Sequence, residues 1–183
     1  MNHVNRVKGA DLALATMQRL DAAARDVDFV VAGIGSMFTD LRGRYRSERI
    51  DWRGFLEEHE RLALIASCDV MLLPFRTDVS VLGLSQTVLE VQAAGNVVVG
   101  SDTPAITPAV RHGVDGVLVR PGSVSVLADA ALHLIGDSDQ RAAIGRAAEA
   151  RAARDWNISD RVAQLQSLLG IAGRQSTSII EVD

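Results

Sequence analysis

A few charged and glycine-flanked residues in this sequence have the types and spacing needed to hold an anionic ligand. Arg6 and Lys8 stand just before a helical pattern that begins near residue 10. Cations beside a helix N-terminus favour a diphosphate, because the helix dipole and the side-chain charges attract it together. Two solvated cations near a chain terminus would give the same pattern. The pair is therefore a candidate diphosphate site, with simple surface charge as the alternative.

Two further candidates follow along the chain. The run Gly83-Leu84-Ser85-Gln86-Thr87 precedes a helical pattern that carries Glu90. Backbone amides at a helix start can hold phosphate oxygens, and a carboxylate further along can accept hydrogen bonds from both hydroxyls of a ribose. A solvent-facing helical glutamate is the alternative for Glu90. Gly33 and Gly35 form a partial glycine turn, which a tight strand-to-helix connection explains equally well.

Metal and cysteine chemistry have little support. Asp26-Val27-Asp28 has the DxD pattern that can hold a divalent metal on a nucleotide diphosphate. It precedes a strand pattern, however, which is the wrong end of a parallel sheet for a ligand, so a loop is predicted. Cys68 is the single cysteine, which excludes an internal disulfide and multi-cysteine metal sites, and it is expected to be buried and inert. No metal site and no cofactor are predicted.

Alternating strand and helix patterns must position these residues. Strands are expected at 28–33, 50–53, 69–74, 96–100 and 116–119, and helices at 10–24, 36–47, 58–67, 84–94, 123–135, 138–153 and 158–169. This alternation predicts an α/β fold with a Rossmann-like, doubly wound parallel sheet, which binds ligands at the carboxyl ends of its strands. We expect one domain over residues 1–170 and a loose tail over 171–183.

Composition limits the class of protein. The chain has 183 residues, 48% hydrophobic, with 19 Lys and Arg against 23 Asp and Glu and a net charge of −4. That balance gives no basic footprint for nucleic acid or an anionic membrane. No apolar run approaches the ~18 residues of a membrane span, and the first residues lack an apolar signal core. A soluble cytoplasmic protein is predicted.

The ordered series of motifs resembles a known family. Along the chain it reads KGADL, a strand ending in GIG, RGFL, ASCDV, MLLP, GLSQTVLEVQAAG, NVVVGSDTP and VRHGVDGVLVRPG. This order resembles the C-terminal, donor-binding half of retaining glycosyltransferases of the GT-B fold, in the large family-four group also called glycosyl transferases group 1. The likeness runs from about residue 5 to residue 169, and it is most specific between residues 84 and 122.

The resemblance implies roles for individual residues. Lys8 matches the lysine that contacts the donor diphosphate and is the implied catalytic residue, and Glu90 matches the second glutamate of the family's E-x7-E motif, which holds the ribose. Phe55 and Leu56 match the segment that contacts the base through its backbone. Other implied donor-binding positions are His3, Arg6, Gly33, Gly35, Leu82, Gly83, Leu84, Ser85, Gln86 and Thr87. The turn at 84–87 would offer its amides to the phosphates.

The sequence also departs from the family pattern. His3 stands where the family usually has an arginine, so Arg6 is expected to serve instead, and Leu82 replaces the first glutamate of E-x7-E, which usually meets the sugar. Only residues 1–4 remain where the first, central strand of the sheet belongs, so that strand is expected to be truncated, leaving two unpaired edges. The resemblance also implies an acceptor-binding N-terminal half, which is not expected among these 183 residues.

The predicted function is therefore that of a donor half. It would bind a UDP- or GDP-linked sugar for retaining transfer to an unknown acceptor, and would be inactive without an N-terminal half. The main alternative is a non-catalytic nucleotide-binding or assembly subunit, and a second is one half of a sugar-nucleotide epimerase. In the family that the sequence resembles, the last helix packs toward the other half. Without that partner its apolar residues would be exposed, which would favour self-association.

Overall fold

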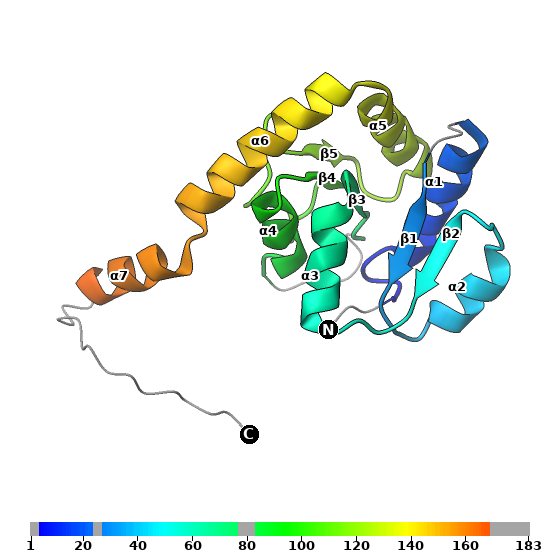
Figure 1. Ribbon diagram of the computed structural model, residues 1–183, viewed down its shortest axis with the longest axis horizontal. Helices are drawn as coiled ribbons and strands as arrows, with labels where there is room; N and C mark the ends of the chain where they lie inside the picture. The colour runs from blue at the N-terminus through cyan, green and yellow to red at the C-terminus, as the bar shows by residue number, and fades with distance from the viewer. Residues whose placement is uncertain (1–3, 24–26, 77–82, 169–183) are drawn as a thin grey trace.

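Figure 1 shows the chain as a computed structural model, in which residues 4–23, 27–76 and 83–168 are described. Its strands are β1 (Phe29–Ala32), β2 (Ile50–Arg53), β3 (Val70–Leu73), β4 (Val97–Ser101) and β5 (Val117–Val119). Its helices are α1 (Ala10–Ala23), α2 (Phe38–Arg44), α3 (Glu58–Ser67), α4 (Gln86–Ala93), α5 (Val124–Gly136), α6 (Ser138–Asp155) and α7 (Ile158–Leu168). Each predicted element is present, with its ends shifted by three residues at most.

All strand pairs are parallel, as the alternating pattern predicts. In the described residues they form two sheets, with β1 beside β2 in one and the order β3-β4-β5 in the other. Phe29 pairs with Ile50 at the start of the first ladder, and Val70 pairs with Val97 in the second. No described strand lies between β1 and β3. Residues 1–3, on which the expectation of a truncated central strand depends, lie outside the described residues, so that expectation stays a prediction.

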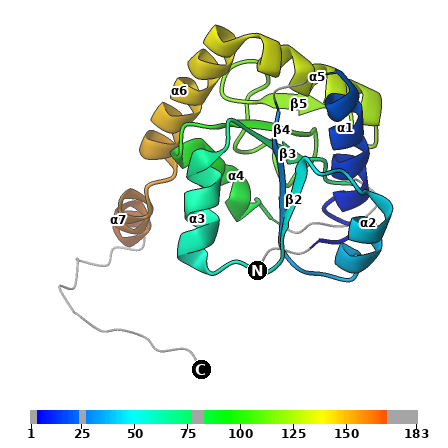
Figure 2. The same cartoon turned by 45° about the vertical axis from the view of Figure 1, so that its right-hand side comes forward.

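The strands lie between two helical layers (Figure 2), with α1, α2 and α5 on one face and α3 and α4 on the other. β4 is buried along its whole length, which explains its continuous apolar sequence. One core cluster joins β1 to α1 and α5 through Leu14, Leu20, Phe29, Ala128 and Ala131. Helix α1 thus packs on α5 and connects the half that contains β1 to the half that contains β4.

Local signals set several helix ends. The Ser123 hydroxyl accepts a hydrogen bond from the Val126 amide at the start of α5, and the Asp137 carboxylate does the same for α6. Glu57 and Glu60 form a reciprocal capping box at the start of α3. Each arrangement satisfies backbone N–H groups that the first helical turn leaves without partners.

A buried carboxylate organises the loop between β4 and β5. The Asp115 side chain is completely buried, and it accepts hydrogen bonds from the backbone N–H and Nε of Arg111, both at 2.6 Å. Arg151 of α6 approaches the same carboxylate at 3.2 Å and also donates to the Ala109 carbonyl. Two guanidinium groups thus neutralise one buried charge and tie α6 to this loop.

Helix α7 extends away from the rest of the molecule (Figures 1 and 2). Three of its apolar side chains are exposed: Val162 by 45%, Leu165 by 56% and Leu168 by 85%. An exposed apolar stripe was expected here from the sequence. The predicted tail, 171–183, lies outside the described residues. Among the helices that the structure describes, none combines the length and the apolar character needed to cross a bilayer.

Candidate functional site

The segment from Val4 to Gly9 crosses the carboxyl ends of β1 and β3. The Val4 N–H donates to the Ile34 carbonyl at 2.8 Å, just past β1, and the Arg76 N–H donates to the Val7 carbonyl at 3.1 Å, just past β3. Gly9 is in the left-handed region with φ +67°, and a Cβ atom there would lie 1.9 Å from the Pro74 carbonyl oxygen. Only glycine fits this close approach.

Lys8 is carried by this segment to the end of β3. Its side chain is half-buried, and its ammonium lies 5.8 Å from the centre of the buried Phe75 ring. Burial lowers the pKa of Lys8 below its ordinary value of 10.5, and the Glu90 carboxylate nearby partly offsets that effect. The structure therefore brings Lys8 and Glu90 together, although they are far apart in sequence. A cation that is partly stripped of water is well suited to hold an anionic oxygen.

Among the residues that the structure describes, Glu90 has two hydrogen-bonding partners. Its Oε2 forms an ion pair with Arg61 of α3, in which both side chains are largely buried, and its Oε1 accepts a hydrogen bond from the Gln86 amide at 3.0 Å. The hydrogen bond with Glu90 raises the pKa of Arg61. The ion pair with Arg61 thus holds the Glu90 side chain in place. Glu90 is largely buried and does not face solvent as the alternative interpretation required. An ionised carboxylate still has further lone pairs for a ligand hydroxyl.

Arg61 was not among the residues predicted from the sequence. Its contact with Glu90 spans 29 positions and depends on α3 packing beside α4. A lone arginine in the middle of an amphipathic helix gives no motif that marks it. The sequence indicated no more about Arg61 than its position, one turn after the start of the helix predicted at residue 58.

In the turn before α4, the backbone at Gly83 is accessible to solvent. Gly83 is exposed at φ +87°, and a Cβ atom there would meet nothing within 4 Å. Ser85 is the N-cap residue, and its side chain makes no capping hydrogen bond to any residue that the structure describes. Leu84 packs against the core next to β3, which anchors this turn. Thr87 is half-buried and lines the same cavity as Lys8 and Arg61.

The glycine turn after β1 has a structural explanation. The Gly33 N–H donates to the Gly54 carbonyl at 2.7 Å, which ties the ends of β1 and β2 together. A Cβ atom on Gly35 would lie 2.4 Å from the Val4 carbonyl oxygen, so the close approach of the N-terminal segment requires glycine there. Close backbone packing thus accounts for Gly35, and the backbone of Gly33, at φ +127°, has a conformation that favours glycine.

The other predicted positions are less closely grouped. Phe55 is 56% exposed and Leu56 is half-buried, both just before α3, and Arg6 is exposed. His3 and Leu82 lie outside the described residues, as does Asp26 of the DxD pattern. Within the described parts, no group of three or more His, Cys, Asp and Glu side chains is arranged to hold a metal ion.

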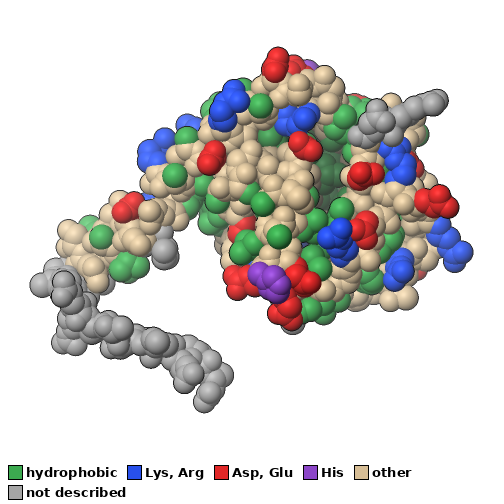
Figure 3. Space-filling view, viewed as in Figure 1, with side chains coloured by type: hydrophobic (Ala, Val, Ile, Leu, Met, Phe, Trp, Pro, Cys, Tyr) green, Lys and Arg blue, Asp and Glu red, His purple; other side chains and the backbone are tan. Residues whose placement is uncertain are grey.

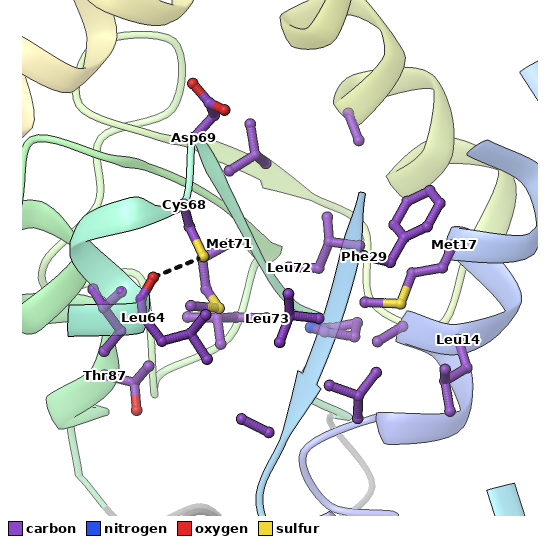
Figure 4. Close-up of a pocket in the computed structure, with 18 of the residues that line it drawn as sticks. Leu14, Met17, Phe29, Leu64, Cys68, Asp69, Met71, Leu72, Leu73 and Thr87 are labelled. Atoms are coloured by element: carbon purple, nitrogen blue, oxygen red, sulfur yellow. Dashed lines mark hydrogen bonds between the residues drawn. The ribbon is translucent and has the colours of Figure 1, made fainter. Parts of the chain in front are cut away.

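An apolar cavity of about 620 Å³ continues from Lys8, Arg61 and Thr87 into the space between β1 and β3. Figure 4 shows its lining from α1, β1, α3 and β3. Cys68 lies on this wall, half-buried where full burial was expected, and its thiol donates to the Leu64 carbonyl at 3.1 Å. Burial raises the pKa of the Cys68 thiol, which keeps it protonated and a poor nucleophile.

Comparison with protein families gives one match. The model described as "Glycosyl transferases group 1" matches residues 1–137. Among characterised proteins, a GDP-mannose-dependent monoacylated alpha-(1-6)-phosphatidylinositol monomannoside mannosyltransferase from Corynebacterium glutamicum is 29% identical over 159 residues, which are 82% of this chain and 40% of the relative. An alpha-D-kanosaminyltransferase from Streptomyces kanamyceticus is 25% identical over 171 residues, 90% of this chain and 43% of the relative. The chain therefore spans about two-fifths of these relatives.

Solved structures show the same fold. Anabaena Alr3699/HepE in complex with UDP superposes with a TM-score of 0.80 at 20% identity, covering 93% of this chain and 47% of that one. The C-terminal domain of a glycosyl transferase group 1 family protein (LpcC) from Francisella tularensis gives a TM-score of 0.78 at 19% identity. In that pair the match covers 86% of this chain and 84% of the other.

Proposed function

This chain belongs to the glycosyl transferases group 1 and has the fold of a GT-B C-terminal domain. From that premise we propose that it binds the nucleoside diphosphate of a sugar donor at Lys8, Glu90 and the turn before α4. The observation that carries the proposal is that a half-buried ammonium and a glutamate held by Arg61 lie near one another at the carboxyl ends of parallel strands. That edge is where open α/β sheets bind their ligands.

Lys8 would act on the diphosphate. Cleavage of a sugar–phosphate bond leaves negative charge on the departing nucleoside diphosphate, and a cation already in place lowers the energy of the transition state as that charge develops. The amides at the start of α4 would add the favourable end of the helix dipole. No metal is required in this arrangement, because the lysine and the helix supply positive potential. Transfer with retention of configuration is part of this proposal.

Glu90 would receive the ribose hydroxyls. Its Oε1 and Oε2 are already oriented by Gln86 and Arg61, so the carboxylate need not reorganise when the ligand arrives. Phe55 and Leu56, just before α3, would border the base. The Corynebacterium glutamicum relative is GDP-mannose-dependent, and a structural neighbour was solved with UDP, so both nucleotides belong in the test.

Catalysis would need the other half of the enzyme. Ligand clefts lie preferentially between domains, and this chain spans about two-fifths of the length of the relatives it matches. We propose that the chain alone binds donor without transferring sugar, and that an N-terminal half binds the acceptor. The second candidate, a nucleotide-binding or assembly subunit, is favoured by the exposed apolar side chains of α7, which would also support self-association.

Calorimetric titration of the 183-residue chain with UDP, GDP and ADP tests the proposal. We expect one of these nucleotides to bind, and Glu90→Ala to weaken that binding by about 1.5–3 kcal/mol, roughly tenfold to a hundredfold in Kd, since hydrogen bonds to a charged group are lost. Glu149→Ala, at an exposed glutamate on α6, is the matched control and should bind as tightly as the unmodified chain.

Circular dichroism and thermal melting of each variant separate loss of binding from loss of fold. Glu90→Ala leaves Arg61 without its carboxylate, so Glu90→Gln provides a second variant of nearly the same size. Equal nucleotide affinity in the folded Glu90 variants and the unmodified chain would remove Glu90 from the site. Failure of all three nucleotides to bind a folded chain would favour the assembly subunit.

The pH dependence of nucleotide binding tests the role of Lys8. The diphosphate is held best by the protonated amine, and burial lowers the pKa of this amine below 10.5. Affinity should therefore fall as pH rises through the lowered pKa, at a lower pH than an ordinary lysine would titrate. Lys8→Arg keeps its charge over this range and should abolish the alkaline fall. A fall of equal size in that variant would assign the effect to another group.

A further inference from the structure

Arg61 forms an ion pair that its surroundings in the sequence do not favour. It follows three exposed glutamates, Glu57, Glu58 and Glu60, and Figure 3 shows acidic side chains gathered on the surface where α3 begins. A pair with Glu57 or Glu58, one helical turn earlier, would keep both charges in water. The Arg61 guanidinium instead contacts Glu90 of α4, and only 16% of the Arg61 side chain and 14% of the Glu90 side chain are exposed.

Stability alone is a weak explanation for this largely buried pair. Two charges that leave water lose their hydration, and the attraction between them often does no more than offset that loss. Well-packed apolar side chains at both positions would join α3 to α4 as firmly. The pair is better explained by a use for the Glu90 carboxylate, which Arg61 then holds in place.

The contacts of Glu90 leave room for a ligand on both carboxylate oxygens. Arg61 donates to Oε2, and the Gln86 amide donates to Oε1 at 3.0 Å. Each carboxylate oxygen has two lone pairs, so one acceptor site remains on each oxygen beside these contacts. Two acceptor sites on one fixed carboxylate match the two neighbouring hydroxyls of a ribose. A 2′-deoxyribose has only one of those hydroxyls and would leave one site empty.

Lys8 competes with Arg61 for the same carboxylate. The charge of Glu90 acts on the Lys8 ammonium, yet among the described residues Glu90 forms its ion pair with Arg61 and not with Lys8. Without Arg61, a largely buried carboxylate would lie near a half-buried ammonium, and each would be the other's nearest counter-charge. Arg61 thus keeps the Lys8 ammonium available for an anionic ligand.

We propose that Arg61 is a positioning residue that divides the site into two parts: by pairing with Glu90, it holds that carboxylate for the ribose and leaves the Lys8 ammonium for the diphosphate. The inference rests on the proposed function, because both parts belong to one bound nucleotide. Arg61 acts through Glu90 and does not itself contact the ligand. It therefore determines how strongly the chain distinguishes a ribonucleotide from a 2′-deoxyribonucleotide.

Selectivity for the ribose is the first readout. Whichever of UDP, GDP and ADP binds the 183-residue chain is titrated beside its 2′-deoxy form. The unmodified chain should bind the ribonucleotide about tenfold more tightly, since the 2′-deoxy form lacks one hydrogen bond to a charged group. This difference should largely disappear in Arg61→Met and return in part in Arg61→Lys. Arg44→Met, which removes an exposed ion pair on α2, is the matched control and should keep the difference.

A double variant shows whether Arg61 acts through Glu90. In Arg61→Met the ribonucleotide should bind at least tenfold more weakly, because Glu90 and Lys8 then pair with each other. Arg61→Met combined with Glu90→Gln should bind more tightly than Arg61→Met and as tightly as Glu90→Gln, because Lys8 is available again. It leaves no charge of the buried pair without a partner, so it preserves the test if Arg61→Met does not fold. Weaker binding than in Glu90→Gln would mean that Arg61 contacts the ligand itself, and would overturn the proposal.

Lys8 is the only lysine in the sequence, so its titration can be followed by NMR with carbon-13-labelled lysine and without any ligand. Arg61→Met should raise the pKa of Lys8, because Glu90 becomes its direct partner. An unchanged pKa of Lys8 in the folded variant would overturn the inference and leave the proposed function standing. An unchanged preference for the ribonucleotide in a folded Arg61→Met chain would do the same. Failure of the folded, unmodified chain to bind UDP, GDP or ADP would overturn both.

Discussion

Asp115→Ala is expected to lower the free energy of unfolding by about 3–5 kcal/mol, the usual cost of removing one partner from a buried ion pair. The Asp115 side chain is fully buried between Arg111 and Arg151. Its removal leaves the Arg151 side chain, which is 13% exposed, with Asp155 as its remaining carboxylate partner, and leaves the backbone N–H of Arg111 without its acceptor. Urea unfolding followed by circular dichroism measures the change.

The matched control for this substitution is Asp102→Ala, at an exposed aspartate that follows β4. Surface changes of this kind usually alter stability by about 0.5 kcal/mol or less. A difference between the two variants below about 1 kcal/mol would mean that the three-residue charge cluster does not hold α6 to the β4–β5 loop. Nucleotide binding is a useful second readout, since Asp115 lies outside the candidate site and a folded variant should keep its affinity.

Gly9→Ala is expected to disrupt the segment that carries Lys8. The left-handed conformation at φ +67° costs an L-residue about 1–2 kcal/mol, and a Cβ atom at 1.9 Å from the Pro74 carbonyl oxygen adds a backbone clash. Because the atom it meets is backbone, side-chain movement cannot relieve the contact. We expect roughly 3 kcal/mol of lost stability together with weaker nucleotide binding, as Lys8 moves away from Glu90.

Gly43→Ala in α2 is the control for Gly9. A Cβ atom at Gly43 would meet nothing within 4 Å, so alanine there should stabilise the helix by about 0.5–1 kcal/mol. If Gly9→Ala melts like the unmodified chain and binds nucleotide equally well, then the 4–9 segment does not need its tight approach to Pro74. Melting curves and calorimetry on the same three proteins give both answers.

The order of elements could be predicted because each carries a local signal. β4 is continuous in apolar residues since it is buried on both faces, and the start of α6 is marked by Asp137, whose carboxylate caps it. Lys8 was singled out from the sequence by the helix that follows it, Glu90 by its place in the helix after the 83–87 turn, and both by the family likeness. The structure places them near one another, while their roles in binding stay predictions.

Contacts between distant segments could not be predicted in the same way. Arg61 meets Glu90 only because α3 packs beside α4, and no short motif reports that packing. The same limit applies to Asp115, which reads as an ordinary loop aspartate until Arg151 of α6 is placed against it. The glycines at 33 and 35 were weighed as a ligand turn. The close approach of Val4 accounts for Gly35, and a positive φ accounts for Gly33, and neither can be seen in the sequence.

The packing of α1 on α5 also determines how cooperatively the molecule unfolds. Ladder hydrogen bonds normally make neighbouring strands open together, and none of the described ladders connects the β1–β2 half to the β3–β4–β5 half. Leu14 and Leu20 of α1, packed with Ala128 and Ala131 of α5, then join the two units together with the 4–9 segment. We expect the smaller unit, with α1, α2, β1 and β2, to open more readily than the larger one, and protection from hydrogen exchange to be lower in β1 and β2 than in β4.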